Sequence, residues 1–185
     1  MSSFKLKTIN MTLDPKSMSG AVREINRFAD DIENICWDLV KKLVDQGKEI
    51  ARMQVVSMDA VLTDQLEQSI RGAYFKEQRC GVVYTNSPYA VFVEFGTGIV
   101  GKQGYQHPML DAVGWEHDKN EHGAAGWWYP ADFGWYIPKG TNVKLAWTKG
   151  MTARPFMYET LGWLEEVAKR EGIKMFKSYA KGGGT

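Results

Sequence analysis

Seven apolar residues recur in alternating steps of three and four between residues 22 and 43. An unbroken spacing of this kind places all of them on one narrow stripe of an α-helix. The preceding Asp14 and Pro15 are a capping residue followed by proline at the first helical position, so the helix is predicted to begin there. The stripe consists of Val22, Ile25, Ala29, Ile32, Cys36, Leu39 and Leu43.

The length of this helix limits how it can pack. Run unbroken from Pro15 to about Val56, it would extend roughly 60 Å at 1.5 Å per residue. A compact domain of this chain length is only about 40 Å across. Either the helix breaks, with Gly47 the expected site, or part of the stripe packs on a neighbouring subunit. A stripe that packs wholly within its own subunit is the third possibility.

The rest of the chain predicts a mixture of short strands and helices. Alternating apolar residues predict a strand over residues 4–13, and two further strands are expected over Gln68–Phe75 and Arg79–Thr85. A short helix over Tyr89–Phe95 and a final helix from Thr152–Pro155 to about Tyr179 follow. The expected fold class is α+β, a small antiparallel sheet packed against a long N-terminal helix and a C-terminal helix, with an aromatic-rich inserted hairpin or loop region. We expect residues 1–180 to form one domain, 99–149 to be the insertion, and 181–185 to be a mobile tail.

Composition excludes several classes of protein. Hydrophobic residues make up 44% and charged residues 24%, which is typical of a folded soluble protein. No run approaches the roughly 20 apolar residues of a membrane helix, and the first residues lack the apolar region of a signal peptide. We therefore expect a protein made and used in the cytoplasm, or in something assembled there. The net charge of +1 gives no sign of a general attraction to nucleic acid.

The sequence carries no recognisable catalytic or metal-binding motif. It has no Gly-x-Ser-x-Gly elbow, no cysteine among its histidines and no phosphate-binding glycine loop with its lysine. His107, His117 and His122 supply ligand types, but their spacing fits no helical or cysteine-assisted zinc pattern. A solvated polar loop is the expected setting of these histidines, and we expect no enzyme activity, no metal and no cofactor.

Two separate segments carry a resemblance to a known family. They are Ser87–Gly98 (SPYAVFVEFGTG) and Gly150–Leu161 (GMTARPFMYETL). Together they resemble the small neck, head-tail joining or tail-completion proteins of long-tailed bacteriophages, in which two such blocks occur in this order after a long helix and a hairpin. The resemblance spans about residues 15–170. It departs from the family at residues 99–149, where the shortest relatives have only a few residues.

The resemblance implies a non-enzymatic virion protein of the neck, assembled in the cytoplasm of the bacterial host. Such a protein forms a homo-oligomeric ring, with six subunits favoured over twelve. The ring lies between a head-side connector and the tail terminator or tail tube, and continues the DNA channel without reading the DNA sequence. No membrane is involved.

The motif residues suit a hinge between two packed segments. Gly96 and Gly98 allow positive φ angles that other residues resist, and Pro155, followed by Phe156, sets φ at the start of the last helix and keeps Arg154 extended. Glu94 lies in an otherwise apolar short helix. One hypothesis is that Glu94 and Arg154 form a partly buried ion pair that docks the two motifs. The alternative is that both are solvated surface charges.

The insertion is unusually rich in aromatic residues, and they allow three interpretations. The rings form a small core of their own, a contact surface for the adjacent ring, or a platform that stacks on carbohydrate. We expect about half to be internal and the rest to lie at subunit contacts. Residues 127–130 and 131–138 are predicted to pair as a hairpin. The aromatic residues are Trp115, Trp127, Trp128, Tyr129, Phe133, Trp135, Tyr136 and Trp147.

Overall fold

The computed structural model describes residues 12–58, 65–132 and 134–181. Residues 4–11 of the predicted first strand, Phe133 and residues 182–185 of the predicted tail lie outside these ranges. In chain order the elements are α1 (Pro15–Ser57), α2 (Gln65–Ser69), β1 (Ile70–Phe75), β2 (Cys80–Thr85), α3 (Ala90–Phe95), α4 (Gly98–Gln103), α5 (Leu110–Val113), the 3-10 turn η1 (Gly123–Ala125), β3 (Trp127–Pro130), β4 (Leu145–Thr148), β5 (Gly150–Met151) and α6 (Phe156–Ala180).

The long first helix begins where the sequence predicts. Its first residue is Pro15, and the carboxylate of Asp14 accepts the backbone N–H of Ser17 at 2.9 Å. This bond satisfies one of the N–H groups that a helix start leaves without a partner. The hydroxyl of Thr12 and the N–H of Ser17 both stabilise the charged carboxylate, which lowers the pKa of Asp14.

Of the alternatives for the long helix, a break at Gly47 is excluded, because α1 continues through Gly47 to Ser57. A Cβ at Gly47 would lie 2.9 Å from the Cδ1 atom of Leu164 and 3.0 Å from the Cγ2 atom of Val83. The glycine therefore lets α6 and β2 approach the helix closely. That packing outweighs the intrinsic cost of glycine in a helix, about 1 kcal/mol relative to alanine.

The chain divides into two compact units. The first comprises Met1–Glu49, Arg71–Tyr84 and Leu161–Thr185, and the second comprises Ile50–Ile70 and Thr85–Thr160. Each unit therefore contains segments that are far apart in the sequence.

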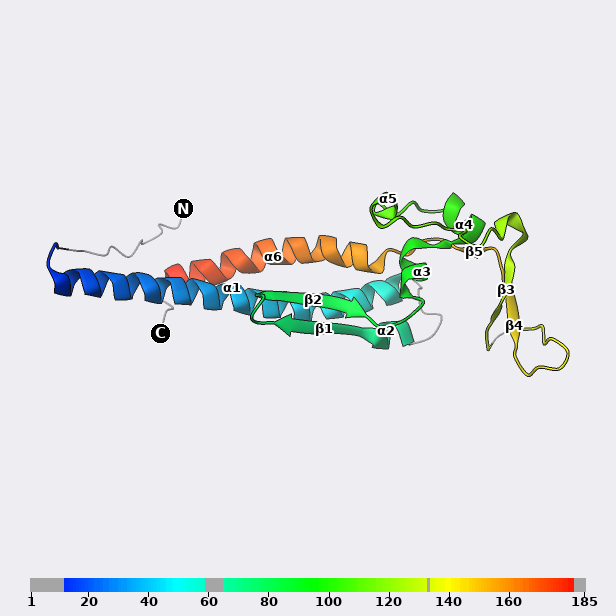
Figure 1. Ribbon diagram of the computed structural model, residues 1–185, viewed down its shortest axis with the longest axis horizontal. Coiled ribbons are helices and arrows are strands. Elements are labelled where there is room, and N and C mark those ends of the chain that lie inside the picture. Colours follow the sequence, from blue (N-terminus) through cyan, green and yellow to red (C-terminus); the bar gives the residue numbers. More distant parts are fainter. Residues whose placement is uncertain (1–11, 59–64, 133, 182–185) are drawn as a thin grey trace. The chain divides into compact units, whose positions relative to one another are not determined.

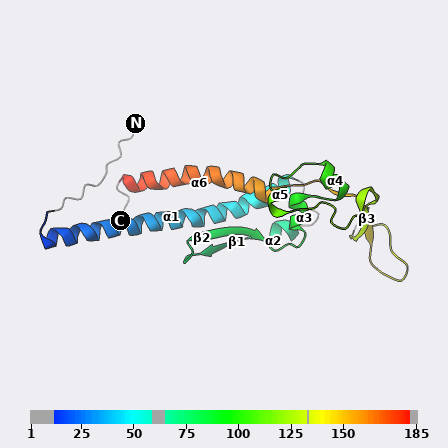
Figure 2. The same cartoon turned by 45° about the horizontal axis from the view of Figure 1, so that its top comes forward.

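In the first unit, α6 packs along α1 and the β1–β2 hairpin lies beside the same helix (Figures 1 and 2). Lys42 of α1 forms an ion pair with Glu171 of α6, and the hydroxyl of Tyr179 donates to Asp31 at 2.9 Å. The rings of Phe28 and Tyr179 are 6.1 Å apart. The predicted mixed fold, with a small antiparallel sheet on the N-terminal and C-terminal helices, is confirmed.

One detail of the predicted sheet is wrong. The strand expected to begin at Gln68 begins at Ile70, because α2 occupies Gln65–Ser69. The chain also forms two separate two-stranded sheets, β1–β2 and β3–β4, in the described ranges. None of the helices in those ranges is both long and apolar enough to cross a bilayer.

The second unit holds the most deeply buried side chains that the structure describes. Val55, Leu66, Ile70, Val93 and Phe156 are all fully buried and all belong to this unit. Two of them, Val93 and Phe156, come from the two motifs singled out in the sequence. The core of this unit is therefore where the motifs meet.

Candidate functional site

The two sequence motifs form one junction inside the second unit. Thr97 pairs with Met151 and Gly98 with Gly150 through antiparallel bridges. The N–H of Arg154 donates to the carbonyl of Val93 at 2.8 Å. Backbone bonds thus join segments that are separated in sequence by the whole insertion.

Glycine is required at this junction both by conformation and by space. The φ angles are +76° at Gly96, +62° at Gly98 and +105° at Gly150, which confirms the predicted positive φ angles at the first two. A Cβ at Gly98 would collide with the carbonyl group of Lys149, and one at Gly150 with that of Thr97. The close approach of the two backbones therefore excludes any larger residue.

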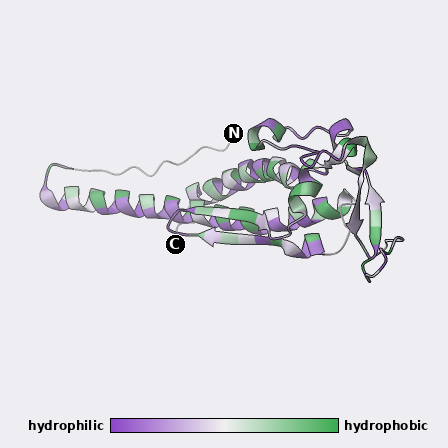
Figure 3. Cartoon of the chain, turned by 45° about the vertical axis from the view of Figure 1, so that its right-hand side comes forward, coloured by the Kyte–Doolittle hydropathy of each residue, from purple (hydrophilic) through white to green (hydrophobic). Residues whose placement is uncertain are grey.

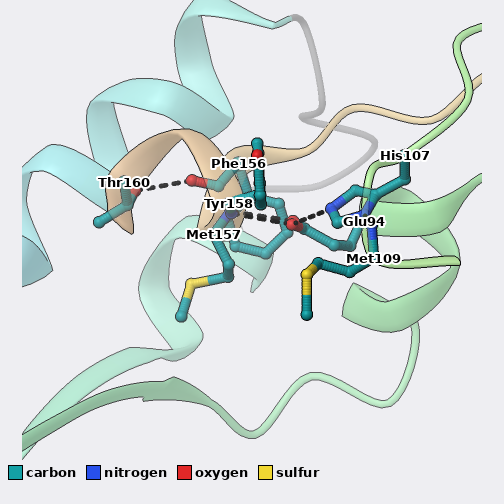
Figure 4. Close-up of polar contacts among 7 residues, drawn as sticks. All are labelled: Glu94, His107, Met109, Phe156, Met157, Tyr158 and Thr160. Atoms are coloured by element: carbon teal, nitrogen blue, oxygen red, sulfur yellow. Dashed lines mark hydrogen bonds and ion pairs between the residues drawn. The ribbon is translucent and has the colours of Figure 1, made fainter. Parts of the chain in front are cut away.

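Glu94 connects α3 to the start of α6. Its carboxylate accepts the backbone N–H groups of Met157 and Tyr158, each at 2.9 Å (Figure 4). These N–H groups belong to the first turn of α6, where they have no partner within the helix. The negative charge also lies at the positive end of the helix dipole. The side chain of Glu94 is only 9% exposed, so α6 is capped by a buried carboxylate from another helix.

His107 completes the environment of Glu94. Its Nε2 atom lies 3.1 Å from the Oε1 atom of Glu94, and its Nδ1 atom accepts the N–H of Met109 at 3.0 Å (Figure 4). Because Nδ1 is an acceptor, the proton is on Nε2, and the neutral imidazole donates to the carboxylate. The centroid of the His107 ring lies 4.4 Å from that of Phe95 and 5.1 Å from that of Tyr158.

The predicted ion pair between Glu94 and Arg154 is wrong within this chain. Both carboxylate oxygens of Glu94 are occupied by the α6 backbone and His107, and no ion pair between Glu94 and Arg154 occurs in the described ranges. Arg154 contributes its backbone N–H instead, while Pro155 and Phe156 are buried. The two motifs are docked by Glu94 as expected, but through backbone donors.

The other histidines do not assemble into a metal site. Among the residues that the structure places, no three His, Cys, Asp or Glu side chains lie close enough to hold a metal ion. The carboxylate of Asp118 accepts the N–H groups of His122 and Gly123, at 2.8 and 2.7 Å. The ring of His122 lies 5.0 Å from that of Trp127. The carbonyl of His117 accepts the N–H of Gly98.

The aromatic insertion forms a hairpin, but with a different second strand. β3 pairs with β4, so Trp128 lies opposite Trp147 and Tyr129 opposite Ala146. The predicted pairing of 127–130 with 131–138 is wrong. Leu145 exchanges both backbone bonds with Tyr136, so residues around Tyr136 lie on the far side of β4.

One group of rings in the insertion is exposed. Trp128 lies 5.1 Å from both Trp135 and Tyr136, centroid to centroid. Trp135 is 76% exposed, and Trp128, Tyr136 and Trp147 are each more than a third exposed. Trp127 and Tyr129, on alternate positions of β3, are half-buried. We call Trp128, Trp135, Tyr136 and Trp147 the aromatic face.

The helical stripe changes character along α1. Ile32, Leu39 and Leu43 are half-buried, and Leu39 lies against Gly172 of α6. Val22 and Ile25 are each 55% exposed. Figure 3 shows apolar residues recurring along this N-terminal part of α1.

No protein-family model matches the chain, and neither a curated protein nor a solved structure is similar enough to count as a match.

Proposed function

We propose that this protein is a structural, non-enzymatic virion component of a long-tailed bacteriophage, which forms a ring in the neck between the DNA-filled head and the tail. The observation that carries the proposal is the junction itself. The two segments that resemble the neck-protein motifs meet through paired glycines and a buried glutamate cap. That the two segments meet in one core supports treating them as one structural unit.

The ring contacts are proposed to lie on two exposed surfaces, one in each unit. The first is the N-terminal part of the α1 stripe, which continues the three-four spacing back to Met18. A helix with this repeat can pack its apolar side chains between those of a second helix, as in a coiled coil. The second is the aromatic face, because tryptophan and tyrosine are enriched at the centres of interfaces.

The same proposal names the molecules that the ring contacts. The ring has six subunits in preference to twelve, takes the head-side connector on one face and the tail terminator or tail tube on the other, and encloses the DNA. It is assembled in the host cytoplasm and works in the virion without cofactor or membrane.

Assembly without the protein tests this function. A stop codon is placed early in its gene in the phage that encodes it, and lysates are examined by electron microscopy. Full heads without tails, and separate tails of normal length, are expected. Complete virions at the normal frequency would overturn the proposal.

The aromatic face supports a second candidate, a module that binds carbohydrate. Exposed tryptophan rings stack on sugars as readily as they pack on protein. Binding of the purified protein to a glycan array, lost in a Trp128→Ala/Trp135→Ala variant, would favour this candidate. A silent array together with particles of ring mass would favour the neck.

A further inference from the structure

One face of α6, together with the turn that follows it, carries a row of positive charges. Arg170, Lys174, Lys177 and Lys181 follow one another in steps of four, three and four, which places them on the same side of a helix. All four are exposed, and with Ile173 and Ser178 they border a shallow, open depression in the first unit. We call these four residues the basic row.

Within the described residues, Arg170 is the one member of the basic row that has an acidic partner. Glu171 forms ion pairs with Lys42 of α1 and with Arg170. The Nε atom of Arg170 lies 3.3 Å from the Oε1 atom of Glu171. Among the residues that the structure places, Lys174, Lys177 and Lys181 form no ion pair. Like charges three or four positions apart weaken a helix, so a bound anion would relieve this repulsion.

We propose that the basic row binds the phosphate backbone of duplex DNA. The inference rests on the proposed function, because it names the surface of each subunit that contacts the DNA in the channel. The row spans roughly 16 Å at 1.5 Å per residue, a length that suits a linear polyanion rather than a single phosphate. Lysines act as point charges on phosphates and read no base sequence.

Two observations favour duplex DNA over other anions. The residues that border the depression include no aromatic ring, whereas single-stranded nucleic acid is held by stacking on such rings. Near the basic row the apolar side of α6 is mostly covered, since Val167 is buried and Tyr179 packs on Phe28, whereas Ile173 is 57% exposed. A helix that lies on a membrane needs that side free for insertion.

The net charge of +1 does not reveal this row. Residues 169–181 contain five lysines or arginines and one acid, Glu171. Acidic residues elsewhere in the chain balance them in the sum. The binding surface is therefore local, and its affinity depends on the arrangement of charges rather than on their total.

The test measures binding of full-length protein to a fluorescent DNA duplex at several salt concentrations. Four phosphate contacts give a slope of about −3.6 in a plot of log K against log salt concentration for each subunit. The affinity then falls roughly 150-fold between 50 and 200 mM salt. The variant Arg170→Gln/Lys174→Gln/Lys177→Gln/Lys181→Gln should bind on the order of 100-fold more weakly at 50 mM salt.

A matched control removes four positive charges from the insertion instead. Lys102→Gln/Lys119→Gln/Lys139→Gln/Lys144→Gln changes the net charge by the same amount and should bind within about threefold of the original protein. Equal loss in both variants, or no loss in the basic-row variant, would overturn the proposal. So would row-dependent binding to phosphatidylserine vesicles that is tighter than binding to DNA. Circular dichroism and thermal unfolding establish that both variants are folded.

Failure of this inference can be told apart from failure of the proposed function. Heads and tails that join normally without the protein would count against the neck role, whatever the DNA titration gives. A titration insensitive to the basic row would count against the row alone.

Discussion

The motif junction and the N-terminal part of α1 differ in how far their side chains are buried and bonded within the chain. At the junction, Glu94 is buried and both its oxygens are bonded within the chain. Along α1, Met18 is 44% exposed, Val22 and Ile25 are 55% exposed, and Phe28 is 54% exposed. The junction is complete within the chain, whereas this part of the helix exposes apolar side chains that further burial would stabilise.

The largest effect is expected at the junction from Glu94→Ala. Removing the carboxylate leaves the N–H groups of Met157 and Tyr158 and the Nε2–H group of His107 without an acceptor in a buried site. The free energy of unfolding should fall by about 3–5 kcal/mol, measured by urea denaturation. Arg154→Ala is the control and should cost less than about 1 kcal/mol. Equal losses of unfolding free energy in the two variants would support an ion pair between Glu94 and Arg154. If Glu94→Ala does not fold, Glu94→Gln replaces it, because the amide keeps one acceptor.

The next effect concerns the close approach of the two backbones. Gly150→Ala places a methyl group against the carbonyl of Thr97 and should destabilise the protein by roughly 3 kcal/mol. Gly114 also has a positive φ, +62°, but nothing lies near the position of its Cβ. Gly114→Ala should therefore cost only about 1 kcal/mol. Similar melting temperatures for the two variants would show that crowding at Gly150 is unimportant.

The exposed stripe should respond in association rather than in folding. Ile25→Glu should change the free energy of unfolding of the subunit by less than about 0.5 kcal/mol. It should weaken self-association by about 2 kcal/mol, roughly 30-fold in the dissociation constant, as measured by sedimentation equilibrium. Asn26→Glu adds the same charge beside the stripe and should leave association unchanged. If Ile25→Glu unfolds the subunit instead, the stripe belongs to the core of its own chain.

The smallest effect is a dependence of stability on pH at the α1–α6 contact. The hydrogen bonds from Lys42 and then Arg170 lower the pKa of Glu171 below its usual value of 4.5. A lowered pKa in the folded state gives stability that is present above pH 4.5 and is lost as the pH falls through the folded-state pKa. In Glu171→Gln the decline of unfolding free energy between pH 5 and 3 should be shallower than in the original protein. Equally steep declines in the two proteins would show that Glu171 does not cause this pH dependence.

The sequence predicts local features of this fold well. Asp14 and Pro15 start α1 because capping and proline geometry act within one turn. Gly96 and Gly98 adopt the expected φ angles for the same reason. A break at Gly47, one of the alternatives, does not occur because this glycine admits α6 and β2, and such contacts leave no local signal.

The partners of Glu94 could not be predicted from side chains alone. Its donors are backbone N–H groups at a helix start, which every helix has and no motif marks. His107 was hidden among the other histidines of the insertion. A carboxylate in an apolar helix, followed much later by a helix start, is the signal that could have suggested the cap.

The pairing of β3 with β4 was not predicted, for a related reason. Residues 131–138 are closer in sequence and equally aromatic, so local pattern favours them. The choice depends on Leu145, which lies opposite Pro130 of β3 in the register and exchanges its backbone hydrogen bonds with Tyr136.

The proposed neck role predicts that the purified protein restores the joining of heads to tails in vitro. Heads and tails assembled without the protein are mixed with purified protein, and plaque-forming units are counted. We predict that the titre rises with added protein and that Ile25→Glu raises it far less than Asn26→Glu. A titre no higher than that of heads and tails mixed without the protein would contradict the account.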